Sequence, residues 1–384
     1  MNNIYMDNAS TTFPKPGVVA DKVAEFISKN GFNINRGTYE GAYGVEEIVY
    51  DTRKKIAELF NCNNCRNVIF TMNVTMALNM VIKGLLKPGD HILVSAMEHN
   101  AVMRPVIQLS KTGVAFDRIP CDRQGNLCMG DMEKLIRPDT RAVIMTHASN
   151  VCGTVMPIKE VGEICKAHNL FFIVDGAQTC GILPVDMKEC NIDALCFTGH
   201  KGMMGPQGIG GFIINDRLVK EVNPIISGGT GSISHTEEVP DFLPDKYEAG
   251  TPNLPGIVGL NASISYIMEY GIDRIYEHEL YLTGLFLEGI KDVHNIRILG
   301  KHNCEKRMGV VGVSFINLDN AQAAYELENK YHILTRVGLH CAPNAHITLE
   351  SYPKGCVRFS FGLYNTADEV QKAIEAVKHI AGGN

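Results

Sequence analysis

The sequence predicts an α/β protein with a large domain, built on a mostly parallel sheet covered by helices, and a smaller α+β domain. Between residues 67 and 214, short apolar runs alternate with segments of helical periodicity. Continuous apolar strands that alternate with helices indicate a parallel sheet buried on both faces. Ligands of such sheets collect at the carboxyl ends of the strands. Polar clusters directly follow four of the strands here, at residues 73–75, 98–100, 147–150 and 175–178.

Length and composition are those of an ordinary globular chain. The 384 residues suggest two or three domains, and a hydrophobic content of 45% is ample for a large core. The net charge of −6 gives no electrostatic footprint for nucleic acid or an anionic membrane. No export signal is evident, and no apolar stretch approaches the ~18 residues of a spanning helix. We therefore expect a cytoplasmic protein without nucleic-acid or membrane partners.

The first 60 residues are expected to form an arm and two helices that precede the sheet. A short strand and a polar turn occupy 5–12, and a helical pattern follows from 16 to about 28. Arg36, in the next polar loop, is either a solvated charge or an anion contact. Residues 45–60 again carry apolar side chains at helical spacing.

The next segment supplies the sheet and the helices that cover it. Strands are expected at 67–71, 91–94, 115–119, 142–146, 170–174, 193–197 and 208–214. Helices are expected at 72–79, 101–110, 129–136 and 158–168.

After the sheet, glycine-rich polar segments at 227–234 and 247–253 are expected to form long loops over the site or an interface. Helices are expected at 255–270, 273–293 and 321–331 and from 367 onward, with strands at 297–299, 310–316 and 357–360. We expect a large domain of residues 16–264, and a small domain of residues 1–15 and 265–384.

The turn after the first sheet strand has the features of an anion site. Asn73, Val74 and Thr75 stand where a buried strand turns directly into a helix. Free backbone N–H groups and the positive end of the helix dipole point at such a turn, and a threonine hydroxyl adds a donor. A plain N-cap explains the same residues, so the turn alone does not decide between the two.

Lys201 stands between a buried strand and a glycine-rich turn, in Thr198-Gly-His-Lys201. Desolvation lowers the pKa of an amine from about 10.4, and a neutral amine can form a Schiff base with a carbonyl. A solvated lysine in an ordinary turn is the alternative on this window alone.

The twelve cysteines are scattered through a long chain without an export signal. We expect most of them to be reduced core residues rather than disulfide partners. Cys62 and Cys65 have the spacing of zinc ligands, but no second pair completes a tetrahedral set. The sequence thus predicts no metal site, although it does not tell whether this pair binds anything.

Four motifs together resemble those of a known family. They are Asp175-Gly-Ala-Gln178, Thr198-Gly-His-Lys201, Glu248-Ala-Gly-Thr-Pro-Asn253 and Arg336-Val-Gly-Leu-His-Cys-Ala342. In their order and spacing, and over nearly the whole chain, they resemble the cysteine desulfurases. These are enzymes of the class V aminotransferase fold (fold type I) that depend on pyridoxal 5′-phosphate (PLP).

The resemblance implies a set of cofactor residues. Lys201 would form the Schiff base, and Asp175 would face the pyridine nitrogen and keep it protonated, so that the ring can take up electrons. His99 would stack on the ring and share in catalysis. The full set implied for the cofactor is Val74, Thr75, His99, Asn150, Asp175, Ala177, Gln178, Thr198, His200, Lys201 and Thr251.

The resemblance also implies the substrate site. Arg358 would grip the substrate carboxylate, because a guanidinium donates two parallel hydrogen bonds, and Asn150 would lie beside it. An exposed arginine at a strand end is the alternative. Cys341, in a polar loop beside His340, would attack the sulfur of bound L-cysteine and become a persulfide while alanine is released. The His340 imidazole is a candidate to assist deprotonation of that thiol.

Partners and competing functions follow from the same residues. If Thr251 crosses between subunits, the active form is a homodimer. The segment from Cys341 to Arg358 is short and restricts the reach of the thiol, so a dedicated sulfur acceptor is expected. Leu339 replaces a histidine found in many relatives, which leaves the proton delivery to Cys341 open. A selenocysteine or cystine lyase that eliminates without Cys341 is the nearest alternative. A non-catalytic PLP-binding regulator and a metal or iron–sulfur scaffold are remoter ones.

Overall fold

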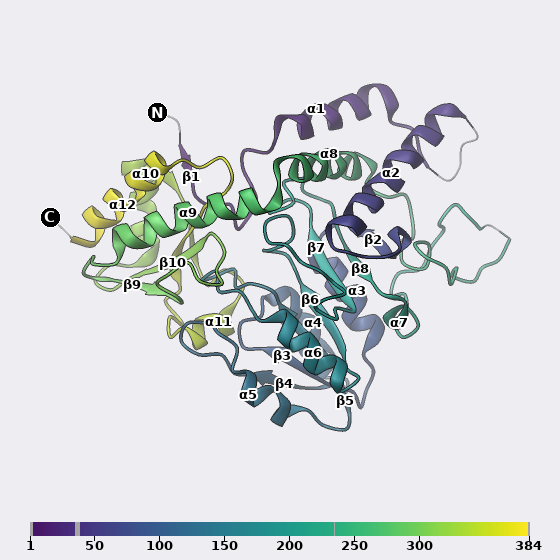
Figure 1. Cartoon of the computed structure of the whole chain (residues 1–384), viewed down its shortest axis with the longest axis horizontal. Coiled ribbons are helices and arrows are strands. Elements are labelled where there is room, and N and C mark those ends of the chain that lie inside the picture. Colours follow the sequence, from purple (N-terminus) through teal and green to yellow (C-terminus); the bar gives the residue numbers. More distant parts are fainter. Residues whose placement is uncertain (1–2, 35–38, 234, 383–384) are drawn as a thin grey trace.

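The computed structural model describes residues 3–34, 39–233 and 235–382. Figure 1 shows two bodies of structure: a large sheet with helices on both faces, and a smaller unit that carries both described ends of the chain. The expected arm at the N-terminus reaches this smaller unit. Arg36, for which the sequence left two interpretations, lies outside the described residues.

The large sheet has seven strands in the order β2-β8-β7-β6-β5-β3-β4. Every pair is parallel except the two that β8 forms with β2 and β7. This confirms the predicted mostly parallel sheet. The strands are β2 (Val68–Thr71), β3 (His91–Ser95), β4 (Ala115–Ile119), β5 (Thr140–Thr146), β6 (Phe171–Asp175), β7 (Ala194–Thr198) and β8 (Gly210–Ile214).

Alternate residues along one strand enter different cores. In β5, Val143 and Met145 belong to one buried cluster, whereas Ala142 and Ile144 belong to another on the opposite face. Side chains of a strand alternate between its two faces, so continuous apolar runs are what burial on both faces requires. This pattern is what made the sheet predictable from the sequence.

Helices cover both faces of the sheet and flank the smaller unit (Figure 1). They are α1 (Gly17–Glu25), α2 (Glu40–Leu59), α3 (Val74–Leu85), α4 (Asn100–Ser110), α5 (Met129–Met132), α6 (Ile158–Ala167), α7 (Asp216–Val219), α8 (Leu254–Tyr270), α9 (Ile272–Ile290), α10 (Asn320–Tyr331), α11 (Pro343–Thr348) and α12 (Ala367–Gly382). Gly271, with φ of 97°, separates α8 from α9, and a glycine adopts such a backbone conformation without strain.

The smaller unit has a four-stranded antiparallel sheet in the order β12-β13-β10-β9. Its strands are β9 (Ile296–Leu299), β10 (Val310–Phe315), β12 (Arg336–Gly338) and β13 (Cys356–Ser360). The N-terminal strand β1 (Ile4–Tyr5) pairs in parallel with β11 (Ile333–Leu334), which ties the arm to this unit. The division into 16–264 and the remainder stays a proposal, and its boundary would fall inside α8.

Several short elements differ from the sequence prediction. The helix expected at 129–136 ends as α5 at Met132 and continues as a 3₁₀ turn to Leu135. The sequence analysis did not predict β11, β12, α7 or α11. These elements have two to six residues, and so short a stretch carries too little periodicity to identify it.

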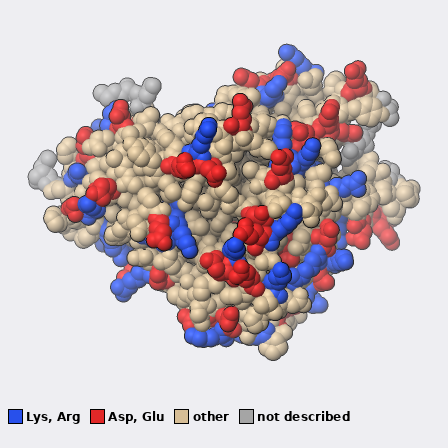
Figure 2. Space-filling view, in the orientation of Figure 1, with Lys and Arg blue, Asp and Glu red and all other residues tan. Residues whose placement is uncertain are grey.

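None of the helices within the described residues combines the length and apolar character that crossing a membrane needs. Figure 2 shows acidic and basic side chains interspersed over one face of the molecule.

Candidate active site

The carboxyl ends of β5, β6 and β7 bring the polar clusters together. These strands are neighbours in the sheet, with Thr146 paired to Asp175 and Asp175 paired to Cys196. The backbone N–H of His147 donates to the carbonyl oxygen of Asp175 at 2.9 Å. Clusters that are 20 or more residues apart in sequence thereby meet at one edge of the sheet, as parallel strand ends do.

Lys201 lies in the turn after β7 and is half-buried. Burial, the largest influence, lowers the pKa of its amine to about 8, while the nearby Asp175 carboxylate acts in the opposite direction. Its backbone is fixed by the N-terminal arm, because the Thr12 hydroxyl donates to the Lys201 carbonyl oxygen at 2.8 Å. A lysine with this pKa is neutral often enough near neutral pH to act as a nucleophile or base.

Asp175 is the last residue of β6 and only 3% exposed. Burial raises the pKa of its carboxyl, and a hydrogen bond from the backbone N–H of Ala177 at 3.0 Å acts against that rise. Gln178, further along the same turn, donates from Nε2 to the carbonyl oxygen of Ala9 at 3.2 Å. A buried carboxylate of this kind needs a cationic or N–H partner, which fits the protonated ring nitrogen of PLP.

His99 stands at the N-cap of α4, after β3. Its Nδ1 accepts from the backbone N–H of Ala101 at 3.0 Å, so the proton of the neutral ring lies on Nε2. Burial, assisted by the positive charge of Lys201, lowers the pKa of His99 to about 4. The adjacent Glu98 is buried and accepts from the Thr146 backbone N–H at 2.9 Å, which joins the His99 turn to the end of β5.

Two buried polar atoms at and after the end of β7 have no partner within the described structure. They are the hydroxyl of Thr198 and Nδ1 of His200, and burial lowers the pKa of His200 to about 4. Thr198 is paired with Gly210 of β8, where an added Cβ would lie 2.9 Å from Cα of Asn73. This close approach sets β7 and β8 against the first turn of α3.

The N-terminus of α3 lies where β7 and β8 approach this helix. Asn73 caps the helix by accepting from the backbone N–H of Met76 at 3.0 Å, and Val74 and Thr75 supply the first helical amides. The sequence left open whether this turn is a plain N-cap or an anion site. The two are compatible here, because the cap leaves the amides of Val74 and Thr75 available to an anion. The orphaned polar atoms and the helix end fit the phosphate group of PLP.

Arg358 is not an exposed strand-end residue, so that alternative is wrong. It lies inside β13, 1% exposed, and donates from Nη2 to Asp7 Oδ1 and to Ser10 Oγ, both at 2.7 Å. Its Nη1 donates to the carbonyl oxygen of Asn150 at 3.1 Å, while its Nε has no partner among the described residues. Asn150 in turn donates from its side chain to the carbonyl oxygen of His340 at 2.7 Å.

Cys341 is the exposed member of the twelve cysteines, all of which are free thiols. Its backbone adopts φ of 57°, and its carbonyl oxygen accepts from the backbone N–H of Asn100 at 2.7 Å. The guanidinium Nη2 of Arg336 lies 3.9 Å from Cys341 Sγ. The thiol therefore lies beside a fixed positive charge and next to the His99 turn.

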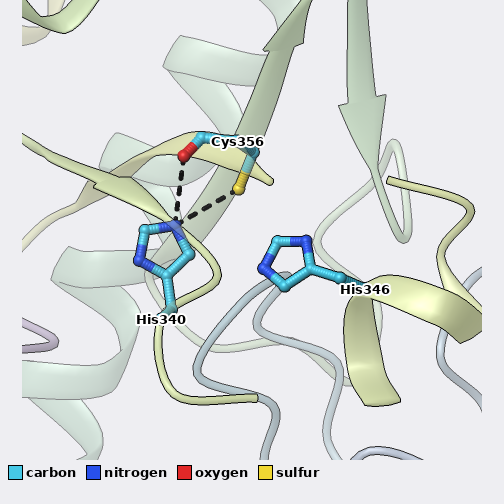
Figure 3. Close-up of side chains that lie close together, drawn as sticks. All are labelled: His340, His346 and Cys356. Carbon is cyan, nitrogen blue, oxygen red and sulfur yellow. Dashed lines mark hydrogen bonds between the residues drawn. The ribbon is translucent and has the colours of Figure 1, made fainter. Parts of the chain in front are cut away.

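The prediction that His340 assists deprotonation of the Cys341 thiol is wrong. His340 is 3% exposed, and its Nε2 lies 3.2 Å from the carbonyl oxygen of Cys356 and 3.4 Å from Cys356 Sγ (Figure 3). Its Nδ1 has no hydrogen-bond partner in the described part of the chain, so neither ring nitrogen is bonded to the Cys341 thiol. Burial and nearby cations lower the pKa of His340 to about 2, and such a ring is a poor proton acceptor.

Thr251 lies apart from the other candidate residues. It is exposed and lines a separate cavity of about 290 Å³ together with Arg53 and Glu248. Arg53 and Glu248 form a close ion pair there, at 2.6 Å between Nη2 and Oε2. The structure of one chain therefore does not bring Thr251 to the strand-end cluster.

Three polar residues of the site were assigned no role from the sequence: Arg336, Asp7 and Ser10. Arg336 was seen only as part of a motif, and its Nη1 also donates to Ser10 Oγ at 3.2 Å. The arm residues come more than 320 positions before the strands that they contact, so no local signal could find them. The polar turn after the first strand was the only hint.

Comparisons with known proteins identify the family of this chain. The model of the family described as aminotransferase class-V matches residues 4–373. A probable cysteine desulfurase from Methanothermobacter thermautotrophicus is 32% identical over 99% of this chain and 95% of its own length. A cysteine desulfurase from Haloferax volcanii is 31% identical over 97% of this chain and 88% of its own length.

Solved structures give the same result. The apo structure of a cysteine desulfurase from Thermococcus onnurineus covers 100% of this chain and 95% of its own, with a TM-score of 0.92 and 32% identity. The cysteine desulfurase CsdA from Escherichia coli covers 98% and 94%, with a TM-score of 0.87 and 27% identity. The chain therefore belongs to the class V aminotransferase family and, within it, to the cysteine desulfurases, a family that implies a PLP cofactor.

Proposed function

We propose that this chain converts L-cysteine to L-alanine and takes the substrate sulfur as a persulfide on Cys341. The observation that carries this proposal is the position of that thiol. Cys341 is exposed, lies 3.9 Å from a guanidinium, and is bonded through its backbone to the turn that holds His99. An exposed thiol beside a cation has the environment of a nucleophilic cysteine rather than a structural one.

The residues of the strand-end cluster would hold PLP. Lys201 would bind its aldehyde, Asp175 would face the ring nitrogen, and His99 and Ala177 would lie against opposite faces of the ring. Thr198, His200 and the Val74–Thr75 turn would hold the phosphate, with Gln178 and Asn150 near the ring oxygen. When bound, PLP supplies a ring that withdraws electrons from the substrate Cα.

Arg358 would bind the substrate carboxylate. Its Nη2 is paired with Asp7, and its buried Nε has no acceptor among the described residues. A substrate carboxylate would satisfy Nε and compete with Asp7 for the guanidinium, in the planar fork geometry that arginine provides. The contact from Arg358 to the Asn150 carbonyl, and from the Asn150 amide to the loop, links substrate binding to the position of Cys341.

Proton transfers are assigned to Lys201. Its Nζ, with a pKa of about 8, can accept a proton and return it near neutral pH. His99 keeps its proton on Nε2 and remains neutral, since its pKa is about 4. It therefore serves as a neutral hydrogen-bond donor.

Sulfur transfer then follows at Cys341. Its thiolate attacks the sulfur of the bound substrate, an S–S bond forms, and the C–S bond breaks with its electron pair left on the carbon. Protonation of that carbon yields alanine, and Cys341 carries the outer sulfur as a persulfide. A dedicated acceptor protein would remove it, because the loop that carries Cys341 is short.

We further propose a homodimer in which Thr251 of one chain completes the phosphate site of the other. The separation of Thr251 from the strand-end cluster within one chain supports this arrangement.

The test replaces Cys341 with alanine. We expect Cys341→Ala to retain the visible absorption band of bound PLP and to lose the formation of alanine and persulfide from L-cysteine. Cys128→Ala removes another incompletely buried thiol, outside the site, and should leave both readouts unchanged. Undiminished turnover of L-cysteine by Cys341→Ala would overturn the proposal, and formation of pyruvate and ammonia, the products of β-elimination, would identify an eliminating lyase instead.

A further inference from the structure

His340, His346 and Cys356 form a cluster that the proposed reaction does not use. Their exposed fractions are 3%, 0% and 0%. One ligand atom from each lies within 4.8 Å of the other two. Among the described residues, this is the group of three histidine, cysteine or carboxylate side chains that is close enough to hold a metal ion. Figure 3 shows the three side chains converging from separate segments of the loop region.

The backbone brings these residues together from both ends of the Cys341 loop. Cys356 opens β13 and is paired with Gly338 of β12, which places it beside the start of the loop. Gly355, with φ of 69°, allows this approach, since an added Cβ would lie 2.4 Å from the Gly338 carbonyl oxygen. His340 directly precedes Cys341, and His346 lies in α11.

His346 presents a bare nitrogen to the cluster. The Ser351 hydroxyl lies 2.6 Å from Nδ1 of His346 and 3.4 Å from the His346 carbonyl oxygen. In the tautomer with its proton on Nδ1, the ring donates to that hydroxyl. Nε2 is then an unprotonated, buried nitrogen without a partner in the described structure. Metal-binding histidines are oriented in this way, with the second ring nitrogen donating to a neighbouring acceptor.

The other two groups are neutral in the metal-free chain. His340 Nε2 lies 3.2 Å from the Cys356 carbonyl oxygen, an acceptor, so this nitrogen carries the proton. Burial raises the pKa of the Cys356 thiol to about 12. The cluster thus consists of two imidazoles and a thiol, all buried, whose ligand atoms lie close together.

We infer that His340, His346 and Cys356 form a binding site for a borderline-soft divalent cation of the Zn²⁺ class, and that this cation clamps the Cys341 loop. Zn²⁺ prefers imidazole nitrogen and thiolate sulfur, at about 2.0–2.1 and 2.3 Å. These bond lengths put neighbouring ligand atoms about 3.5 Å apart, so atoms within 4.8 Å need to move by about 1 Å. Three protein ligands leave one position for water.

Binding is balanced in protons and involves no redox change. The Cys356 thiol releases its proton to solvent as the thiolate–metal bond forms. His340 exchanges its Nε2 proton for one on Nδ1, which has no partner in the metal-free chain. One proton is therefore released for each cation bound.

The consequence lies in the loop. The cation would join the residue before Cys341, the helix after it and the strand at its far end. A clamped loop would hold the backbone of Cys341 in place. This structural role is separate from the PLP chemistry and does not depend on it.

The test uses the PLP-loaded enzyme, stripped with a chelator and dialysed against Zn²⁺. We expect one zinc per chain by mass spectrometry of the metal, and a zinc-edge X-ray absorption spectrum with one sulfur and two imidazole nitrogens. Cys356→Ser and His346→Gln should each lower the zinc affinity at least tenfold in competition with a chelating dye. Cys62→Ser and Cys341→Ala are the matched controls and should bind zinc as the parent chain does.

Several results would overturn the inference. Zinc affinity that survives Cys356→Ser, or that is lost in Cys62→Ser or Cys341→Ala, assigns the metal to another thiol. Should the two cluster variants fail to fold, a parent-chain spectrum without the sulfur and two nitrogens rejects the site. Amide hydrogen exchange at 341–355 should slow on zinc addition, and unchanged exchange with zinc bound rejects the clamp.

Discussion

Burial of Lys201 determines the pH at which its amine becomes reactive. Its pKa is lowered to about 8, mainly by desolvation. The amine is protonated and unreactive below this pH, and neutral above it. We predict that the rate of PLP uptake by the cofactor-free protein rises with pH and levels off above about pH 8, rather than near 10.5.

Stopped-flow absorbance after mixing with PLP measures this rate. Lys201→Ala should show no covalent phase at any pH. A rate in the parent chain that keeps rising up to pH 10 would contradict the lowered pKa.

The guanidinium of Arg336 lies 3.9 Å from the thiol of Cys341. A charged contact to a thiolate contributes about 1 kcal/mol, which corresponds to about fivefold in rate. We predict that Arg336→Ala slows persulfide formation on Cys341 by about fivefold, and that Arg336→Lys restores part of the rate because the charge is kept. Single-turnover persulfide formation, detected by mass spectrometry, is the measurement.

The control for this prediction is Arg123→Ala, which removes an arginine with an 81% exposed side chain. It should react as the parent chain does. Equal rates in Arg336→Ala and Arg123→Ala would remove Arg336 from the mechanism.

Among the elements, α3 has its N-terminus at the proposed phosphate site. The Asn73 side chain caps this helix, and loss of such a cap costs about 1 kcal/mol. We predict that Asn73→Ala lowers the free energy of unfolding by this amount and also weakens PLP binding by about fivefold. Frayed first-turn amides bind the phosphate less well.

Asp319→Ala is the matched control, because Asp319 caps α10 away from the site by accepting from Ala321 and Gln322. Denaturant unfolding should show a similar loss of stability in both variants. PLP titration should show weaker binding only for Asn73→Ala, and an equal loss in both variants would indicate a general effect of destabilisation.

For the whole molecule, the proposed exchange of Thr251 between subunits predicts complementation. Lys201→Ala is expected to be inactive, and Thr251→Glu should be inactive because its carboxylate repels the phosphate of PLP. When both variants are unfolded and refolded together, mixed dimers contain one site with both native residues. We expect alanine formation to recover to about a quarter of the parent activity, since random pairing gives half mixed dimers with one working site each.

The control places both substitutions in one chain, which is then refolded with Lys201→Ala. No mixed dimer then has a complete site, and activity should stay absent. With both variants inactive alone, absence of recovery in the first mixture would show that Thr251 acts within its own chain, and an active Thr251→Glu would show that Thr251 has no part in the site.

The sequence by itself determined the elements that have strong local patterns. Strands β2, β3 and β5 to β8 were expected because burial on both faces demands mostly apolar residues, and Asp175 and Lys201 were placed because they stand at or just after the ends of such strands. The family was identified from the order and spacing of four short motifs along the chain. Short elements such as α11 carry no such pattern and were missed.

The tertiary structure alone decided which residues of the site contact one another. Arg358 is paired with Asp7, His340 turns toward Cys356 instead of Cys341, and the arm holds the Lys201 turn. Periodicity reports which face of an element is buried, but not which distant side chain it meets there. Contacts between residues hundreds of positions apart, and the ring orientation of a buried histidine, depend on packing that only the folded chain provides.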